Sequence, residues 1–248
     1  MKDELGEHGE LGEHGELGYY HAYLRLKERL VDLIRVNRYV SVCDIGGGRP
    51  PLFSLEDVRQ LGLAYTILDV SQEELDQAPA GYRKIRSDIC DAGLGHIPER
   101  FDLIFSRMVA EHVPDGVAMH RNVLTLLNPG GIAFHMFPTL FNPVFLANKL
   151  LPRKAAERVV YLVRPWARRV PKFPAPYSKC YGPTRRMQRF FKDLGYEIEQ
   201  YRPFYGTDYL EGLPILGTVD SIFTRFVARR RSPHFTSYVW VTLRKPRS

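Results

Sequence analysis

Short apolar runs alternate with segments of helical periodicity along most of the chain. Strands are predicted at residues 40–45, 64–70, 83–87, 101–106, 131–137, 198–203 and 235–243, and most of these segments are apolar runs typical of buried strands. Helices are predicted between them at residues 54–61, 71–77, 117–127 and 183–194. Strands that alternate with helices predict a mostly parallel sheet with helices on both faces.

The two ends of this pattern complete the predicted fold. Residues 19–38 carry apolar side chains at helical spacing and predict an amphipathic helix ahead of the first strand. Two strands follow the last predicted helix, and we expect them to form a hairpin with one antiparallel edge. The fold class is therefore α/β, a Rossmann-like doubly wound sheet of seven strands with an antiparallel last strand and a helical insertion after strand five.

Composition agrees with one globular domain that carries an insertion. The chain has 248 residues, of which 44% are hydrophobic and 25% charged, which excludes disordered, collagenous and coiled-coil classes. Three scattered cysteines, Cys43, Cys90 and Cys180, are too few for a disulfide framework, and we expect no metal site. No apolar run is long enough to span a bilayer and no secretory leader is recognisable, so a cytoplasmic protein is expected.

Four segments follow from the pattern. Residues 1–18 repeat a Gly-rich, acidic hexapeptide and predict a flexible tail. Residues 19–139 form the α/β core, and residues 140–182 are a basic, proline-interrupted amphipathic insertion. Residues 183–248 complete the core with a helix and the strand hairpin.

Charge is distributed unevenly. The net charge is +7, yet residues 1–18 carry −5, whereas residues 140–176 and residues 221–248 each carry +7. Basic clusters attract phosphate-bearing substrates, anionic membranes or RNA, and they also occur on ordinary solvated helices. The charge therefore leaves the partner open.

A glycine turn follows the first strand. Asp44 ends that strand, and Gly46, Gly47 and Gly48 follow, so the backbone can turn tightly and a ligand can lie against bare peptide. Pro51 stands where the dinucleotide pattern needs its last glycine, which disfavours a nicotinamide or flavin site.

Acidic residues also end the next two strands. Asp69, followed by Val70, ends the second strand about 20 residues after the glycines, the distance at which a carboxylate reaches ribose hydroxyls. Asp88 and Ile89 follow the third strand and suit the amine and face of an adenine. Ser106 and Arg107 end the fourth. All these positions fall on the carboxyl edge of the sheet, where open α/β folds bind ligands.

These motifs together resemble those of the class I S-adenosylmethionine-dependent methyltransferases, most closely the type 11 subgroup. The resemblance runs from about residue 38 to 138. The matching segments are 44–48, Asp69, 87–89, 101–106, 111–115 and 126–131.

The resemblance implies S-adenosyl-L-methionine as cofactor and a role for each motif. Gly46, Gly47 and Gly48 would approach its methionine part, and Asp44 would orient the amino group. Asp69 and Val70 would lie at the ribose, Asp88 and Ile89 at the adenine. Ser106 and Arg107 would line the floor. The third glycine position of the family pattern is Pro50 here, which stiffens the loop.

Methyl transfer from a sulfonium needs alignment more than a reactive side chain, but a hydroxyl acceptor would gain from a general base. The candidates for that base are His112 and His135, with Tyr177 and Tyr181 as further options. Oxygen is preferred over nitrogen because nothing marks an amine site. The predicted acceptor is a small molecule or a glycan.

The insertion, residues 140–182, lies outside the region that resembles the family. Three interpretations stay open: a substrate lid, a peripheral contact with an anionic membrane, and a homodimer interface. The lid would use the aromatics Trp166, Phe173, Tyr177, Tyr181, Phe204, Tyr205 and Tyr209. An RNA-binding or RNA-modifying protein is the alternative function, suggested by Arg229, Arg230 and Arg231, although the motifs of base-methylating enzymes are missing.

Overall fold

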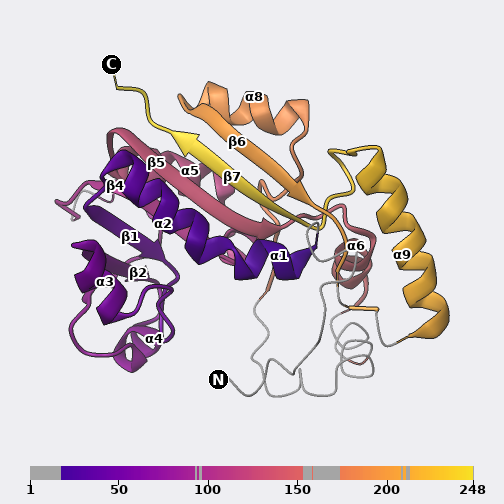
Figure 1. Cartoon of the computed structure of the whole chain (residues 1–248), viewed down its shortest axis with the longest axis horizontal. Helices are drawn as coiled ribbons and strands as arrows, with labels where there is room; N and C mark the ends of the chain where they lie inside the picture. Colours follow the sequence, from indigo (N-terminus) through magenta and orange to yellow (C-terminus); the bar gives the residue numbers. More distant parts are fainter. Residues whose placement is uncertain are drawn as a thin grey trace.

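The structure, a computed structural model, describes residues 18–92, 94, 97–152, 158, 174–207, 209–210 and 213–247. Its centre is a seven-stranded sheet in the order β3-β2-β1-β4-β5-β7-β6 (Figure 1). The strands are β1 Ser41–Ile45, β2 Ala64–Asp69, β3 Arg83–Arg86, β4 Phe101–Arg107, β5 Leu127–Pro138, β6 Glu197–Phe204 and β7 Tyr238–Arg244. The first five are parallel, and β7 runs antiparallel to both β5 and β6. The predicted fold class is confirmed.

Helices cover both faces of the sheet. They are α1 Tyr19–Leu24, α2 Leu26–Asn37, α3 Leu55–Leu61, α4 Gln72–Gln77, α5 Gly116–Leu126, α6 Pro143–Leu150, α8 Arg185–Asp193 and α9 Pro214–Arg229. A short 3-10 helix, η2 Ala110–His112, follows β4. Figure 1 shows α1 and α2 in front of the strands and α5 behind them. Among the described residues, no helix has the length and apolarity needed to cross a bilayer.

The C-terminal prediction needs a correction. The last two strands pair antiparallel as expected, but they do not form a hairpin, because α9 lies between β6 and β7 in the chain. The edge of the sheet also differs from the expectation. The antiparallel strand β7 lies between β5 and β6, and β6, which runs parallel to β5, forms the edge. The sequence pattern missed α9 because its apolar residues do not gather on the face that meets the core: Ile215 and Ile222 are 80% and 60% exposed.

Other expectations agree with the elements to within a few residues. The helix predicted for residues 19–38 is divided at Arg25 into α1 and α2. Within the insertion, Asn142 caps α6 by accepting hydrogen bonds from the backbone N–H of Val144 and Phe145. Residues 1–17 of the acidic tail and residues 153–157 and 159–173 of the insertion lie outside the described residues, and with them Trp166 and Phe173.

Strand register determines where the site lies. Ile45 at the end of β1 aligns with Leu68 of β2 on one side and with Ser106 of β4 on the other. The loops that follow these three strands therefore leave the sheet at one edge, close together. β1 is also where the strand order reverses, and open α/β sheets bind ligands at that position.

Candidate functional site

The glycine turn after β1 has no room for side chains. Gly46 has a φ of +71°, and a Cβ there would come within 2.4 Å of Cγ2 of Val109. A Cβ on Gly47 would lie 2.7 Å from Cγ and Oδ2 of Asp44. Real Cβ atoms do not approach other atoms so closely, so the turn requires bare backbone at both positions.

Asp44 is buried directly below this turn. Its Oδ2 accepts a 2.6 Å hydrogen bond from the phenol of Tyr65 and a longer one, 3.3 Å, from the backbone N–H of Leu52. Burial raises the pKa of Asp44 to about 6, and the two hydrogen bonds and the charge of Arg107 oppose that rise. The pKa of Asp44 is therefore close to neutral pH, in a place where a cationic ligand would favour the charged form of the carboxyl group.

Asp69 lies beside the same turn. Its Oδ1 accepts a 2.9 Å hydrogen bond from the N–H of Ser71, which leaves Oδ2 on the side of Gly48. A Cβ on Gly48, whose φ is +35°, would be 3.1 Å from that Oδ2 and 3.2 Å from Cβ of Glu74. Burial raises the pKa of Asp69, and the charge of Glu74 adds to the rise. Acidic groups thus face the bare backbone from two strands and one helix.

The third acid lies further along the edge. Asp88 follows β3 and is half-buried, and its Oδ1 accepts a 2.8 Å hydrogen bond from the N–H of Cys90. Ile89 beside it is buried, whereas Val70 after β2 is 63% exposed. Asn122 of α5 fixes this loop by donating to the carbonyl of Ile89 at 2.8 Å. At this part of the sheet edge, Val70 offers an apolar surface and the loop that carries Asp88 offers a carboxylate.

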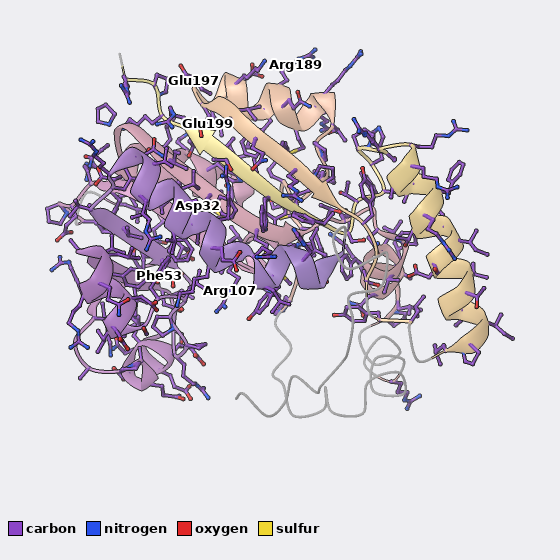
Figure 2. The ribbon with its side chains drawn as sticks, in the orientation of Figure 1. Asp32, Phe53, Arg107, Arg189, Glu197 and Glu199 are labelled. Carbon is purple, nitrogen blue, oxygen red and sulfur yellow. The ribbon has the colours of Figure 1, made fainter. Side chains whose placement is uncertain are left out.

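Arg107 connects β4 with the front helix. Its guanidinium donates to the phenol oxygen of Tyr23 in α1 at 3.2 Å and to the carbonyl of Pro50 at 3.3 Å, and it lies over the Tyr23 ring. Figure 2 labels Arg107 close to the front helices. Arg107 therefore joins α1 to the far end of the glycine turn.

Ser106 and His135 do not lie where the sequence suggested. Both are fully buried, and Oγ of Ser106 lies 2.8 Å from Nδ1 of His135. The His135 ring packs edge-on against His120, which in turn contacts Phe191 of α8. Burial lowers the pKa of His135 to about 4. The His135 ring lies beneath His120 of α5, and its complete burial argues against a role as general base, just as the burial of Ser106 argues against a lining role for its side chain.

His112 lies at the carboxyl edge, in η2. Its Nδ1 is 2.9 Å from the carbonyl of Pro174, which can only accept, so Nδ1 carries the proton. Its Nε2 lies 3.7 Å from Oε1 of Glu111, and the side chain of His112 is 37% exposed. In the neutral ring Nε2 is then the basic nitrogen. Of the two predicted bases, His112 is the one with an exposed side chain.

Glu111 was not expected to be buried. It is 3% exposed, and burial raises its pKa to about 8. Burial raises the pKa of the neighbouring Tyr177, and the charge of Glu111 adds to that rise. The backbone N–H of Tyr177 donates to the carbonyl of Glu111. Tyr181 is half-buried and lies against Phe141 with ring centroids 5.3 Å apart. Tyr177 is therefore an enclosed packing residue with a strongly held proton.

Three side chains at the site were missed from the sequence: Tyr65, Tyr23 and Glu74. Tyr65 gave only a weak signal, because it lies in a mostly apolar strand next to a second hydroxyl side chain, Thr66. Glu74 had a clearer one, because Ser71 caps α4 by accepting from the N–H of Glu74, a Ser-x-x-Glu start.

Comparisons with known proteins show which family and which solved structures this chain resembles. A family model described as a methyltransferase domain matches residues 16–201. Two proteins named uncharacterized methyltransferase, from Mycobacterium sp. strains KMS and MCS, are each 30% identical over 106 residues, which is 42% of this chain. The matched region spans 40% of the length of these relatives.

Solved structures share the fold at low identity. A crystal structure of an S-adenosylmethionine-dependent methyltransferase from Clostridium acetobutylicum has a TM-score of 0.54 at 13% identity, covering 90% of this chain and 92% of that one. One from Mesorhizobium loti has a TM-score of 0.50 at 20% identity, covering 83% and 91%. The [4+2]-cyclase SpnF has a TM-score of 0.52 at 17% identity, covering 89% and 82%. A protein with this fold can thus carry out a different reaction, so the side chains of the site must decide the chemistry.

Proposed function

Because the chain belongs to the methyltransferase domain family, we propose that it transfers a methyl group from S-adenosylmethionine to the oxygen of a small-molecule or sugar-containing acceptor. The observation that carries the proposal is the pairing of Asp44 and Asp69 around a glycine turn that excludes side chains. Acidic groups around bare backbone suit a ligand that carries positive charge together with hydroxyls.

The residues present fit the cofactor. Gly46 and Gly47 would lie against its methionine part, Asp44 would attract the ammonium group, and Asp69 would accept from the ribose hydroxyls. Val70 and Ile89 would contact the adenine, with Asp88 at its amine. When bound, S-adenosylmethionine supplies an electrophilic methyl group on a sulfonium, so the chain's own task is to align the acceptor and exclude water.

Arg107 acts here as a positioning residue. It joins α1 to the carbonyl of Pro50, and α1 would thereby be held over the methionine end of the ligand. Its positive charge also favours the ionised form of Asp44.

His112 supports oxygen as the target. A hydroxyl acceptor must lose a proton during the transfer, and Nε2 of His112 would receive it, since the carbonyl of Pro174 fixes the proton on Nδ1. The neighbouring Glu111 lies 3.7 Å from Nε2 and would stabilise the imidazolium when it is ionised.

Calorimetric titration of the protein with S-adenosylmethionine and with S-adenosylhomocysteine tests the cofactor, and NAD is the control. Saturable binding of the first two and none of NAD is expected. A screen of hydroxylated metabolites and glycans that follows release of S-adenosylhomocysteine then tests the acceptor. Absent binding in folded protein, together with copurifying nucleic acid and a steep salt dependence, would favour the RNA alternative.

A further inference from the structure

Helix α9 presents an apolar stripe to the outside of the molecule. Ile215, Val219, Ile222 and Phe226 are spaced four, three and four positions apart, which places them on one face of the helix. They are 80%, 59%, 60% and 57% exposed. The helix is held through its opposite face, where Thr224 and Val227 are buried. Figure 1 shows α9 at the outer end of the molecule.

Basic side chains lie at the C-terminal end of this stripe. Arg225 and Arg229 are exposed on the helix, and Arg230 and Arg231 follow it directly. The guanidinium of Arg230 lies 5.3 Å from the centroid of the Phe226 ring, so charge and apolar surface are adjacent. Asp220 is the one acidic residue of segment 213–232, and it is half-buried.

A cavity with two arginines in its wall lies beyond the C-terminal end of the helix. It has a volume of about 450 Å³ and lies between the start of α8 and the segment that follows Arg231. Exposed Arg185, Arg186 and His234 contribute to its wall. Apolar side chains flanked by exposed arginines are the pattern of helices that lie in the interface of an anionic bilayer.

Other occupants fit this surface less well. A parallel two-fold contact between two copies of α9 would place the same arginines of both copies near one another, which costs electrostatic free energy. An antiparallel contact would leave those arginines at its two ends, where segment 213–232 offers no acidic partner besides the half-buried Asp220. A nucleic acid would be attracted by the arginines but gains little from a row of exposed aliphatic side chains. An anionic lipid surface satisfies both features together.

We propose that α9 docks this protein on an anionic lipid surface, with the side chains of Ile215, Val219, Ile222 and Phe226 in the interface and Arg225 and Arg229–Arg231 on the lipid phosphates. The topology gives this docking a direction. α9 runs from the end of β6 to the start of β7, and Tyr238 of β7 pairs with Pro138 at the carboxyl end of β5. The docked helix is therefore on the edge of the sheet that carries the glycine turn.

Cosedimentation of the full chain with vesicles tests the proposal without any methyl transfer, so its outcome is separate from that of the proposed function. The probes are vesicles of phosphatidylcholine and vesicles of phosphatidylcholine mixed equally with phosphatidylglycerol. The protein is expected to pellet with the second kind and to be released by high salt. Val219→Asn with Ile222→Asn should weaken this partitioning about tenfold or more, and neutralising Arg229, Arg230 and Arg231 with glutamine should remove its salt dependence.

Matched control variants separate docking through α9 from nonspecific binding to vesicles. Val36→Asn replaces a valine that is 82% exposed on α2, and glutamine at Arg35, Arg59 and Arg121 neutralises three exposed arginines on other helices. These variants should pellet like the unaltered protein. Failure of the unaltered protein to bind anionic vesicles would overturn the proposal, as would equal losses in the α9 and control variants. A doubled mass in solution that the α9 variant returns to a monomer, with no vesicle binding, would assign the stripe to a second copy instead.

Discussion

The phenol oxygen of Tyr65 lies 2.6 Å from Oδ2 of Asp44, and both side chains are buried below the glycine turn. The phenol donates to the carboxyl group and lowers its pKa against the larger, opposing effect of burial. Tyr65 therefore keeps part of the Asp44 population ionised at neutral pH, in the form that attracts an ammonium group.

Replacing Tyr65 with phenylalanine should raise the pKa of Asp44 above its value of about 6. We expect S-adenosylmethionine to bind more weakly at pH 6.5, by about 1 kcal/mol, the usual contribution of one such hydrogen bond. The deficit should shrink at pH 8.5, where Asp44 is ionised in both proteins. Calorimetry at the two pH values measures this, with Tyr39→Phe as the control, whose phenol bonds the carbonyl of Gly130 instead. A deficit that does not change with pH would refute the assignment.

Asp69→Ala should weaken binding of S-adenosylmethionine by more than about 1 kcal/mol, because the ribose would lose a charged acceptor. Asp69→Asn keeps an acceptor for the N–H of Ser71 and should still lose affinity, which separates ligand binding from loop structure. Asp76→Ala changes an exposed acid on α4 and should bind normally. Near-equal affinities in all three variants would remove Asp69 from the site.

Glu111 should make the protein less stable as the pH rises. Its pKa is raised by burial from 4.5 to about 8, so the folded state holds the proton more tightly than the unfolded state. Stability is therefore greatest below pH 4.5 with respect to this group, and it falls by at most roughly 1.4 kcal/mol per unit up to pH 8. Glu111→Gln should remove that slope in urea unfolding between pH 5 and 8. Glu56→Gln, an exposed change on α3, should keep it.

His135 should make the protein more stable as the pH rises, the opposite of the effect of Glu111. Burial lowers its pKa from 6.5 to about 4, so the unfolded state binds the proton more tightly. Its contribution is complete above pH 6.5 and is lost as the pH falls toward 4. His135→Asn, which keeps a polar atom near Oγ of Ser106, should reduce the loss of stability over that range in acid titrations followed by circular dichroism. The exposed His234→Asn should leave the acid transition unchanged, and an equal effect of the two changes would contradict the buried-histidine explanation.

Most of the sheet could be predicted because its strands are apolar and separated by helices that are polar on one side. The carboxyl edge followed from this order, since Asp44, Asp69 and Asp88 each end a strand. The sequence pattern could not place α9, because a helix with its apolar side chains outward breaks the link between hydrophobic periodicity and the core. It also did not predict that β7 pairs with β5 as well as with β6, since strand order depends on packing between distant segments.

Side-chain direction was the other limit. Ser106 and His135 lie at paired positions of β4 and β5, and alternation along the strands turns both toward α5 and α8. A one-residue difference in register would have turned them the other way. The burial of Glu111 next to the exposed His112 likewise depends on the turn of η2.

The insertion of β7 between β5 and β6 has a consequence for how the protein is made. Thr139 at the end of β5 and Thr236 before β7 are hydrogen-bonded although 97 positions separate them. Until Tyr238–Arg244 leaves the ribosome, β5 and β6 each expose an edge with unpaired peptide groups, and such edges recruit other strands. The nascent chain therefore passes through a stage open to aggregation, and chaperone demand during synthesis should be greatest just before β7 emerges.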